Sequence, residues 1–181
     1  FPAGVSSLEI HAFWGCRGLT EVIIPDGVTN IGWRAFQMCS ELESVFIPSS
    51  VTSIGHNAFS DCPSLTEIEL PSGVDIEHEV FCSDSNLVHV ALSDGLSRIG
   101  DFAFAECVNL REITIPKTVE SIGELAFADC ASLRAVYFQG AVPTFGENVF
   151  RDADVVTVYC LPDAEGWPES IDGRPVIRRA F

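Results

Sequence analysis

Phenylalanine recurs at a nearly constant interval through the whole chain. It occupies positions 13, 36, 59, 81, 104, 127 and 150, so successive rings are 23, 23, 22, 23, 23 and 23 residues apart. A small or branched residue precedes each ring, and an apolar residue follows six positions after it. Such a period is typical of a solenoid, in which each coil buries its apolar side chains against the coils on either side.

The repeating unit is clearest in residues 19–41 and 42–64, where it reads L-x-x-V-x-I-P-x-x-V-x-x-I-G-x-x-A-F-x-x-C-x-x. The alternating V-x-I predicts a short strand whose valine and isoleucine point inward. The proline ends strand pairing because it lacks an N–H, and the glycine lets the backbone turn. We expect A-F-x-x-C to form about one helical turn that buries the ring and the sulfur.

Three segments repeat one cassette in register: V-T-N-I-G-W-R-A-F-Q-M-C-S-E-L at residues 28–42, V-T-S-I-G-H-N-A-F-S-D-C-P-S-L at 51–65 and V-E-S-I-G-E-L-A-F-A-D-C-A-S-L at 119–133. This cassette resembles the BspA-like leucine-rich repeats of bacterial and some protist surface proteins. The resemblance covers about residues 1–161. It implies a right-handed, β-rich leucine-rich repeat solenoid of about seven repeats, with short strands, short helical or 3-10 turns and a strand-lined concave face. It also implies binding or adhesion at the cell surface, and it brings no catalytic residue and no cofactor.

The last twenty residues differ in composition from the repeats. Residues 158–177 resemble the terminal segment that often closes such arrays in secreted bacterial proteins. We therefore divide the chain into a solenoid, residues 1–161, and a C-terminal capping segment, residues 162–181. Trp167 and Ile177 are expected to cover the end of the core, because a terminal unit must present a polar outer face.

The fourth repeat departs most from the consensus. It is one residue short and lacks its glycine between Val74 and Glu77, Asp84 stands in the cysteine column, and Ser93 replaces the following proline. The seventh repeat has Ala153 in the cysteine column. These changes predict a local bend or irregular packing near residues 74–86.

The beginning of the chain falls in the middle of a repeat, because Phe1-Pro2 aligns with the I-P pair of the consensus. We therefore expect the chain to be part of a longer polypeptide. It has no run of 18 apolar residues, so we expect no transmembrane segment.

Acidic residues outnumber basic ones, 26 to 10, which gives a net charge of −16. No cluster of Lys and Arg is present, and this disfavours nucleic acid and anionic lipid as partners. Acidity spread over outward positions commonly serves solubility. The other interpretations are a basic partner or weak sites for divalent cations.

Seven cysteines are present, and five of them share one column of the repeat. That column contains Cys16, Cys39, Cys62, Cys107 and Cys130. A zinc site needs converging donors, whereas these are spread along the axis, so we interpret them as inward-facing hydrophobes. Disulfide pairing stays open, although an odd number leaves at least one free thiol in a monomer. Cys82 and Cys160 are predicted to be the more reactive ones, Cys160 because it falls at an outward strand position.

The outward strand positions form two columns that would face a ligand. The first column is predicted as Glu21, Ser44, Glu67, His89, Glu112, Ala135 and Val158. The second is predicted as Ile23, Phe46, Glu69, Ala91, Thr114, Tyr137 and Cys160. Ile23, Phe46 and Tyr137 are candidate anchors for a partner, because exposed aromatic side chains are typical of interfaces. Alternatively, they are scattered surface apolar groups.

Four polar members of these columns lie on consecutive coils, namely Glu67, Glu69, His89 and Glu112. Carboxylates beside an imidazole can coordinate a metal or raise the histidine pKa, but an ordinary cross-strand charge pair is commoner. We assign no metal to them. Together with the three apolar candidates they form the candidate binding residues.

Motifs that carry catalytic chemistry are missing from the sequence. It has no H-E-x-x-H, G-x-S-x-G, P-loop or G-x-G-x-x-G pattern, and an open solenoid lacks the enclosed pocket that catalysis uses. We therefore expect a non-catalytic module of a secreted or cell-surface bacterial protein, which binds an extracellular protein or glycan through its strand face. The alternatives are a rigid spacer that presents another domain and, third, an enzyme domain.

Overall fold

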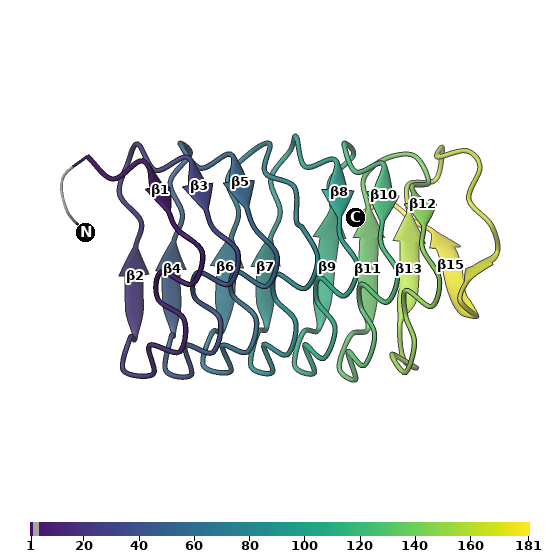
Figure 1. Ribbon diagram of the computed structural model, residues 1–181. Coiled ribbons are helices and arrows are strands. Elements are labelled where there is room, and N and C mark those ends of the chain that lie inside the picture. Colours follow the sequence, from purple (N-terminus) through teal and green to yellow (C-terminus); the bar gives the residue numbers. More distant parts are fainter. Residues whose placement is uncertain (2–3) are drawn as a thin grey trace.

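The chain forms a solenoid of about seven coils, with about 23 residues in each coil (Figure 1). This computed structural model describes residue 1 and residues 4–181, so Pro2, which was predicted to align with the repeat's proline, lies outside the described residues. A regular coil contributes a strand to a long-strand row, a shorter strand to a second row, and a turn that carries the repeated phenylalanine. We name each coil after its phenylalanine.

The two rows contain parallel strands that follow one another along the solenoid axis (Figure 1). The long-strand row comprises β2 (Glu21–Ile23), β4 (Ser44–Phe46), β6 (Glu67–Glu69), β7 (His89–Ala91), β9 (Glu112–Ile115), β11 (Ala135–Phe138) and β13 (Thr157–Cys160). The short-strand row comprises β1 (Ser7–Leu8), β3 (Asn30–Ile31), β5 (Ser53–Ile54), β8 (Arg98–Ile99), β10 (Ser121–Ile122) and β12 (Thr144–Phe145).

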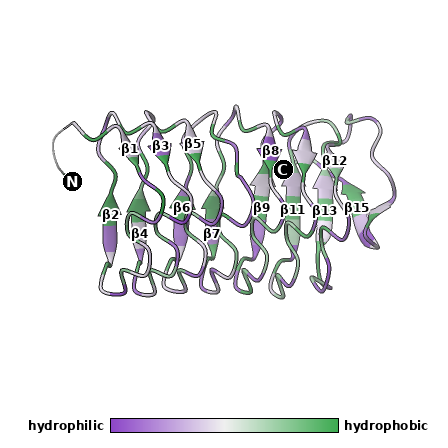
Figure 2. Ribbon diagram, viewed as in Figure 1, coloured by the Kyte–Doolittle hydropathy of each residue, from purple (hydrophilic) through white to green (hydrophobic). Residues whose placement is uncertain are grey.

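One continuous apolar core runs through the inside of the coils. Exposed and buried residues alternate within β2, β6 and β9, so that one side of each strand packs inward. The long strands carry both hydrophilic and hydrophobic residues (Figure 2). The seven phenylalanine rings stack in a single column, with neighbouring ring centroids 5.1–5.8 Å apart and ring planes within 17° of parallel. The predicted solenoid with a shared core is therefore confirmed.

The turns that carry the phenylalanines are not helical, so the predicted helical or 3-10 turn is wrong. The second residue before and the second residue after each ring have positive φ, and a helix needs negative φ throughout. These residues are His11, Gly15, Arg34, Met38, Asn57, Asp61, Glu79, Ser83, Phe102, Glu106, Leu125, Asp129, Asn148 and Asp152. The backbone instead bonds to the next coil. The Phe36 N–H, for example, donates to the Ala58 carbonyl at 2.8 Å, and the Phe127 N–H to the Val149 carbonyl at 2.9 Å.

The short Phe81 coil interrupts the short-strand row. Ile76 makes only an isolated bridge with Ile99, and the row divides into β1–β3–β5 and β8–β10–β12. The turn of this coil stays regular, because the Phe59 N–H donates to the Val80 carbonyl at 3.0 Å and the Phe81 ring stacks on both neighbours. The irregularity predicted for residues 74–86 is therefore confined to the strand part of the coil.

Asp75 compensates for part of the lost ladder. In regular coils a backbone carbonyl accepts the hydrogen bond at this level, as Thr29 does from the Thr52 N–H. In the Phe81 coil the Asp75 carboxylate accepts from the Ser97 N–H at 2.7 Å and from the Arg98 N–H at 3.0 Å. A side chain thus replaces a backbone acceptor where the chain is one residue short.

The long-strand row is also divided. Among the described strands, β4 forms no ladder with β6, and β7 forms none with β9. The row therefore consists of β2–β4, β6–β7 and a longer sheet from β9 through β11 and β13 to β15 (Arg174–Arg178), which also pairs with β14 (Ser170–Ile171). Between the Phe59 and Phe81 coils, neither strand row forms a ladder. Only the turns of these two coils are joined by backbone hydrogen bonds.

Buried thiols form a column beside the phenylalanines. Each thiol donates to a phenylalanine carbonyl of the preceding coil, as Cys62 Sγ does to Phe36 at 3.2 Å and Cys107 Sγ to Phe81 at 3.2 Å.

Asp84 occupies this column in the Phe81 coil and is completely buried. Its Oδ1 accepts from the Cys62 N–H at 2.8 Å, whereas Oδ2 has no partner within the described residues. Burial raises the pKa of Asp84 well above its usual value, which favours the neutral acid.

The C-terminal segment adds a strand to the end of the long-strand row. β15 pairs in parallel with β13 and antiparallel with β14. Trp167 is buried against Phe138, with ring centroids 4.8 Å apart, as its predicted position over the core requires. Ile177 was predicted to share this role, but it is 44% exposed; Ile171 of β14 is buried instead. No helix in the described part of the chain is long and apolar enough to cross a membrane.

Candidate binding face

The outward side chains of the long-strand row form one face of the solenoid. Ladder register within the paired strands sets their order. The first column contains Glu21, Ser44, Glu67, His89, Glu112, Ala135 and Thr157. The second contains Ile23, Phe46, Glu69, Ala91, Thr114, Tyr137 and Tyr159. In register, six of the seven predicted members of each column are correct, although Ala135 is buried rather than exposed.

The seventh member of each column was predicted wrongly. Val158 and Cys160 are completely buried, and Thr157 and Tyr159 take the outward positions. The strand β13 begins directly after Val156, whereas the corresponding strands begin two residues after their apolar residue. The segment before β13 is thus one residue shorter than in the other coils. Because side chains alternate across a strand, this turns Val158 and Cys160 inward and places Thr157 and Tyr159 outward.

The three candidate anchors differ in exposure. Ile23 is 61% exposed and Phe46 is 59% exposed, as predicted. Tyr137 is half-buried, because its ring lies 5.1 Å from that of Tyr159 and 5.1 Å from that of Phe181. The C-terminal residue thus lies over the aromatic part of this face, which the sequence analysis did not foresee.

A groove opens on the face above β4, β6 and β7. It has a volume of about 810 Å³, and the candidate residues that line it are Phe46, Glu67, Glu69 and His89. Ile23 borders a separate hollow of about 540 Å³ near the N-terminal end. Glu112 and Tyr137 lie on neither hollow. The structure therefore brings together four of the seven candidate residues and leaves the other three apart.

The groove is acidic and its carboxylates are unpaired. Glu21, Glu67 and Glu69 line it, and none of them forms an ion pair within the described residues. His89 lies beside Glu67 in the ladder register. No group of three or more His, Cys, Asp or Glu side chains in the described part of the chain is arranged to hold a metal ion. The face thus presents unpaired negative charge.

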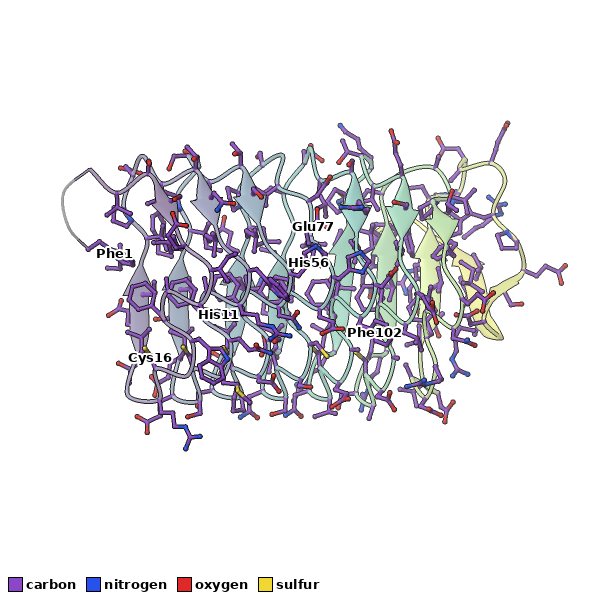
Figure 3. The ribbon with its side chains drawn as sticks, viewed as in Figure 1. Phe1, His11, Cys16, His56, Glu77 and Phe102 are labelled. Atoms are coloured by element: carbon purple, nitrogen blue, oxygen red, sulfur yellow. The ribbon has the colours of Figure 1, made fainter. Side chains whose placement is uncertain are left out.

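The cysteines differ from their predicted roles in three positions. Cys16 is exposed at the N-terminal end of the solenoid (Figure 3), although it belongs to the predicted inward column. Cys160, predicted to be reactive, is buried, and burial raises its thiol pKa. Cys82 is half-buried, and burial raises its pKa to about 11, which disfavours the nucleophilic thiolate.

The other four members of the column, Cys39, Cys62, Cys107 and Cys130, are buried as predicted. Burial raises their pKa values, to about 11 for Cys39 and about 12 for Cys130. All seven cysteines are free thiols. The column therefore acts as apolar filling that also donates weak hydrogen bonds.

The parallel strand rows, the stacked core and the repeating turns define a leucine-rich repeat solenoid. The model of the family described as "BspA type Leucine rich repeat region" matches residues 1–83 and 74–164, with six copies of the repeat. The chain belongs to this family. A comparison with curated protein sequences gave no match.

Several solved structures share the fold. A leucine-rich repeat protein from Bacteroides ovatus is 26% identical, with a TM-score of 0.76, over 88% of this chain and 48% of that protein. The T. pallidum leucine-rich repeat protein TpLRR is 31% identical, with a TM-score of 0.78, over 86% of this chain and 74% of that chain. The pneumococcal vaccine antigen PcpA, 15% identical with a TM-score of 0.58 over 90% of this chain and 56% of its own, shows the fold alone. This chain thus spans about half the length of the Bacteroides ovatus protein.

Proposed function

We propose that this chain is a non-catalytic binding module of a secreted or surface-attached bacterial protein, and that it holds a protein or glycan partner against its long-strand face. The module acts outside the cell and needs no cofactor. The observation that carries the proposal is the groove over β4, β6 and β7, which joins an exposed aromatic side chain to unpaired carboxylates.

The rigidity of the scaffold supports this proposal. Outward side chains stand on strands whose inward neighbours, such as Val22, Ile68 and Val90, are buried in a continuous core. A fixed array of this kind loses little conformational freedom when a partner binds, and this favours affinity. Phe46 is the natural anchor, because it is large, exposed and located on the wall of the groove.

A rigid spacer is the second candidate function. The solenoid's length and its stacked core favour it, since a rod of this construction can hold another domain at a distance. A spacer needs no ligand on either face. Binding experiments on defined surfaces therefore separate the two functions.

The test measures binding of the purified chain to a panel of purified extracellular proteins and to a glycan array. Ile23→Ala and Phe46→Ala remove the apolar anchors of the long-strand face. Matched controls are Ile10→Ala and Trp14→Ala, because Ile10 is 58% and Trp14 is 53% exposed outside that face. We expect at least one partner in the panels, with binding reduced about tenfold or more by Phe46→Ala, as for an interface hot spot, and unchanged by the two controls.

Two results would contradict the proposal. If no member of either panel binds, the spacer is the better account. If the control substitutions reduce binding as much as Phe46→Ala, the long-strand face is not the binding surface. Circular dichroism spectra of all four variants verify that each one retains the fold.

A further inference from the structure

We propose that the break between β4 and β6 is the ligand site itself, and that it takes an extended polypeptide segment in which apolar and basic side chains alternate. This inference rests on the proposed function, because it assumes that the long-strand face binds a partner. It names the class of that partner and excludes glycans from this groove.

The break exposes part of the core. Val45 lies at the inward position of β4, yet it is only half-buried. The equivalent side chains Val22, Ile68, Val90 and Ile113 are each no more than 5% exposed. Val45 and the exposed ring of Phe46 therefore give the groove an apolar wall on the β4 side.

The break also leaves backbone groups without partners. Alternate residues of a parallel strand direct their backbone groups to opposite neighbours. The Ser44 N–H and the Phe46 carbonyl bond toward β2, and the Leu70 N–H bonds toward β7. The backbone groups of Val45 and Glu67 consequently face the break, where no cross-strand hydrogen bond exists in the described chain.

The short Phe81 coil adjoins the break. In regular coils the glycine N–H bonds to the preceding coil, as the Gly55 N–H does to Ile31 at 2.8 Å and the Gly100 N–H to Ile76 at 2.7 Å. Glu77 occupies this position in the Phe81 coil (Figure 3) and makes no such bond to Ile54. One residue fewer thus detaches the strand part of this coil from the Phe59 coil, while the turns remain connected.

The charge of the groove selects the ligand. The carboxylates of Glu67 and Glu69 stand on the β6 side, opposite the apolar wall, and Glu21 lies at the periphery of the same groove. His89 is the only lining side chain that can carry positive charge. A neutral glycan offers no cation to these carboxylates, and an anionic one is repelled by them. Lysine and arginine side chains of a polypeptide supply the missing charge.

The two walls specify the pattern of that polypeptide. Successive side chains of an extended chain point to opposite sides. A segment lying along the groove therefore directs every second side chain toward Phe46 and the others toward Glu67 and Glu69. Alternating apolar and basic residues satisfy both walls at once.

The test titrates the chain with the synthetic peptide acetyl-Leu-Lys-Leu-Lys-Leu-Lys-amide by isothermal titration calorimetry. A block peptide, acetyl-Leu-Leu-Leu-Lys-Lys-Lys-amide, and a peptide with Glu in place of Lys serve as ligand controls. The protein variants are Phe46→Ala and the double variant Glu67→Gln/Glu69→Gln. Glu120→Gln is the matched control, because Glu120 is an exposed carboxylate that lies outside the long-strand face and does not line the groove.

We expect the alternating peptide to bind at least about tenfold more tightly than the block peptide, and the Glu peptide not to bind. Both groove variants should weaken binding about tenfold, with Glu120→Gln within about twofold of the unmodified chain. Equal binding of the block or Glu peptide, or an equal loss in Glu120→Gln, would overturn the inference. If the alternating peptide fails to bind while Phe46→Ala still abolishes binding of a glycan or protein in the panels, this inference falls and the proposed function stands.

Discussion

The two halves of the long-strand face are built from the same repeat but differ in the continuity of the sheet. In the C-terminal half, β9, β11, β13 and β15 form an unbroken ladder whose outward tyrosines stack on each other and on Phe181. In the N-terminal half the ladder is broken between β4 and β6, and a groove lies over the break. We infer that the shortened Phe81 coil opens the face between β4 and β6, whereas the second break, between β7 and β9, separates coils of regular length.

The turns, unlike the strand ladders, are continuous in both halves of the solenoid. Inter-coil hydrogen bonds and stacked rings continue from Phe13 to Phe150 without interruption. Because the break leaves this edge intact, the solenoid tolerates a shortened coil. We therefore expect stability to depend more on the phenylalanine column than on the strand ladders.

The largest expected effect is the loss of a ring from that column. Phe81→Ala in the short coil and Phe127→Ala in a regular coil should each lower the free energy of unfolding by about 3–5 kcal/mol, because both rings are completely buried. Urea denaturation measures both. If Phe81→Ala costs less than about a third of Phe127→Ala, the turns of the short coil are not packed like the others, and the comparison fails.

A smaller effect is expected at Asp84, which marks the short coil within the cysteine column. Asn can accept from the Cys62 N–H and donate where the thiols of the column donate, without an ionisable group. At pH 7, Asp84→Asn should raise the free energy of unfolding by about 1–3 kcal/mol, the cost of an unsatisfied buried polar group. A free energy of unfolding that is unchanged or lower in urea denaturation at pH 7 would contradict the idea that the buried Asp84 carboxyl group destabilises the fold.

The pH dependence of the free energy of unfolding provides a second test at Asp84. Burial raises the pKa of Asp84 in the folded chain above its unfolded value of about 3.9. The folded chain therefore keeps a proton that the unfolded chain releases, so the stability that Asp84 contributes is complete below about pH 4 and declines as the pH rises. The advantage of Asp84→Asn should accordingly be small at pH 4 and grow toward pH 7. The matched control Asp94→Asn, at an exposed carboxylate, should show no such trend.

An effect of similar size but opposite sign is expected at Asp75, whose carboxylate replaces a backbone acceptor beside the break. Asp75→Ala removes its hydrogen bonds to the Ser97 and Arg98 amides and should cost about 1.5–3 kcal/mol in urea denaturation at pH 7. Asp94→Ala, at an exposed carboxylate 4.0 Å from Lys117, should change stability by less than about 0.5 kcal/mol. Equal effects would show that Asp75 contributes nothing to the repair of the ladder.

The sequence predicted much of this molecule because the period acts on every coil alike. The spacing of the rings and the alternation around Val22 predicted the core, and the same register predicted that Ile23 and Phe46 are exposed. The left-handed turns were missed, because residues such as Met38 and Leu125 carry no local signal for positive φ. Their conformation follows from hydrogen bonds between coils.

Features that depend on one missing residue were predicted less well. The shortened last coil exchanged the faces of Val158 and Cys160, which a uniform period of 23 does not reveal. The deletion before Ile76 was visible, but the sequence does not show which ladder opens, because that depends on how whole coils tilt against each other. The groove follows from that three-dimensional adjustment.

Amide hydrogen exchange tests the central claim, that the short coil opens the long-strand face, most directly. In the unmodified chain the amides of Val45 and Glu67 should exchange at least about tenfold faster than those of β11, which is bonded on both sides. A variant with one serine inserted after Asp75 and Glu77→Gly restores the regular coil length, and it should slow exchange at Val45 and Glu67 while leaving β11 unchanged. Equally slow exchange at all these amides in the unmodified chain, or no change on insertion, would contradict the account.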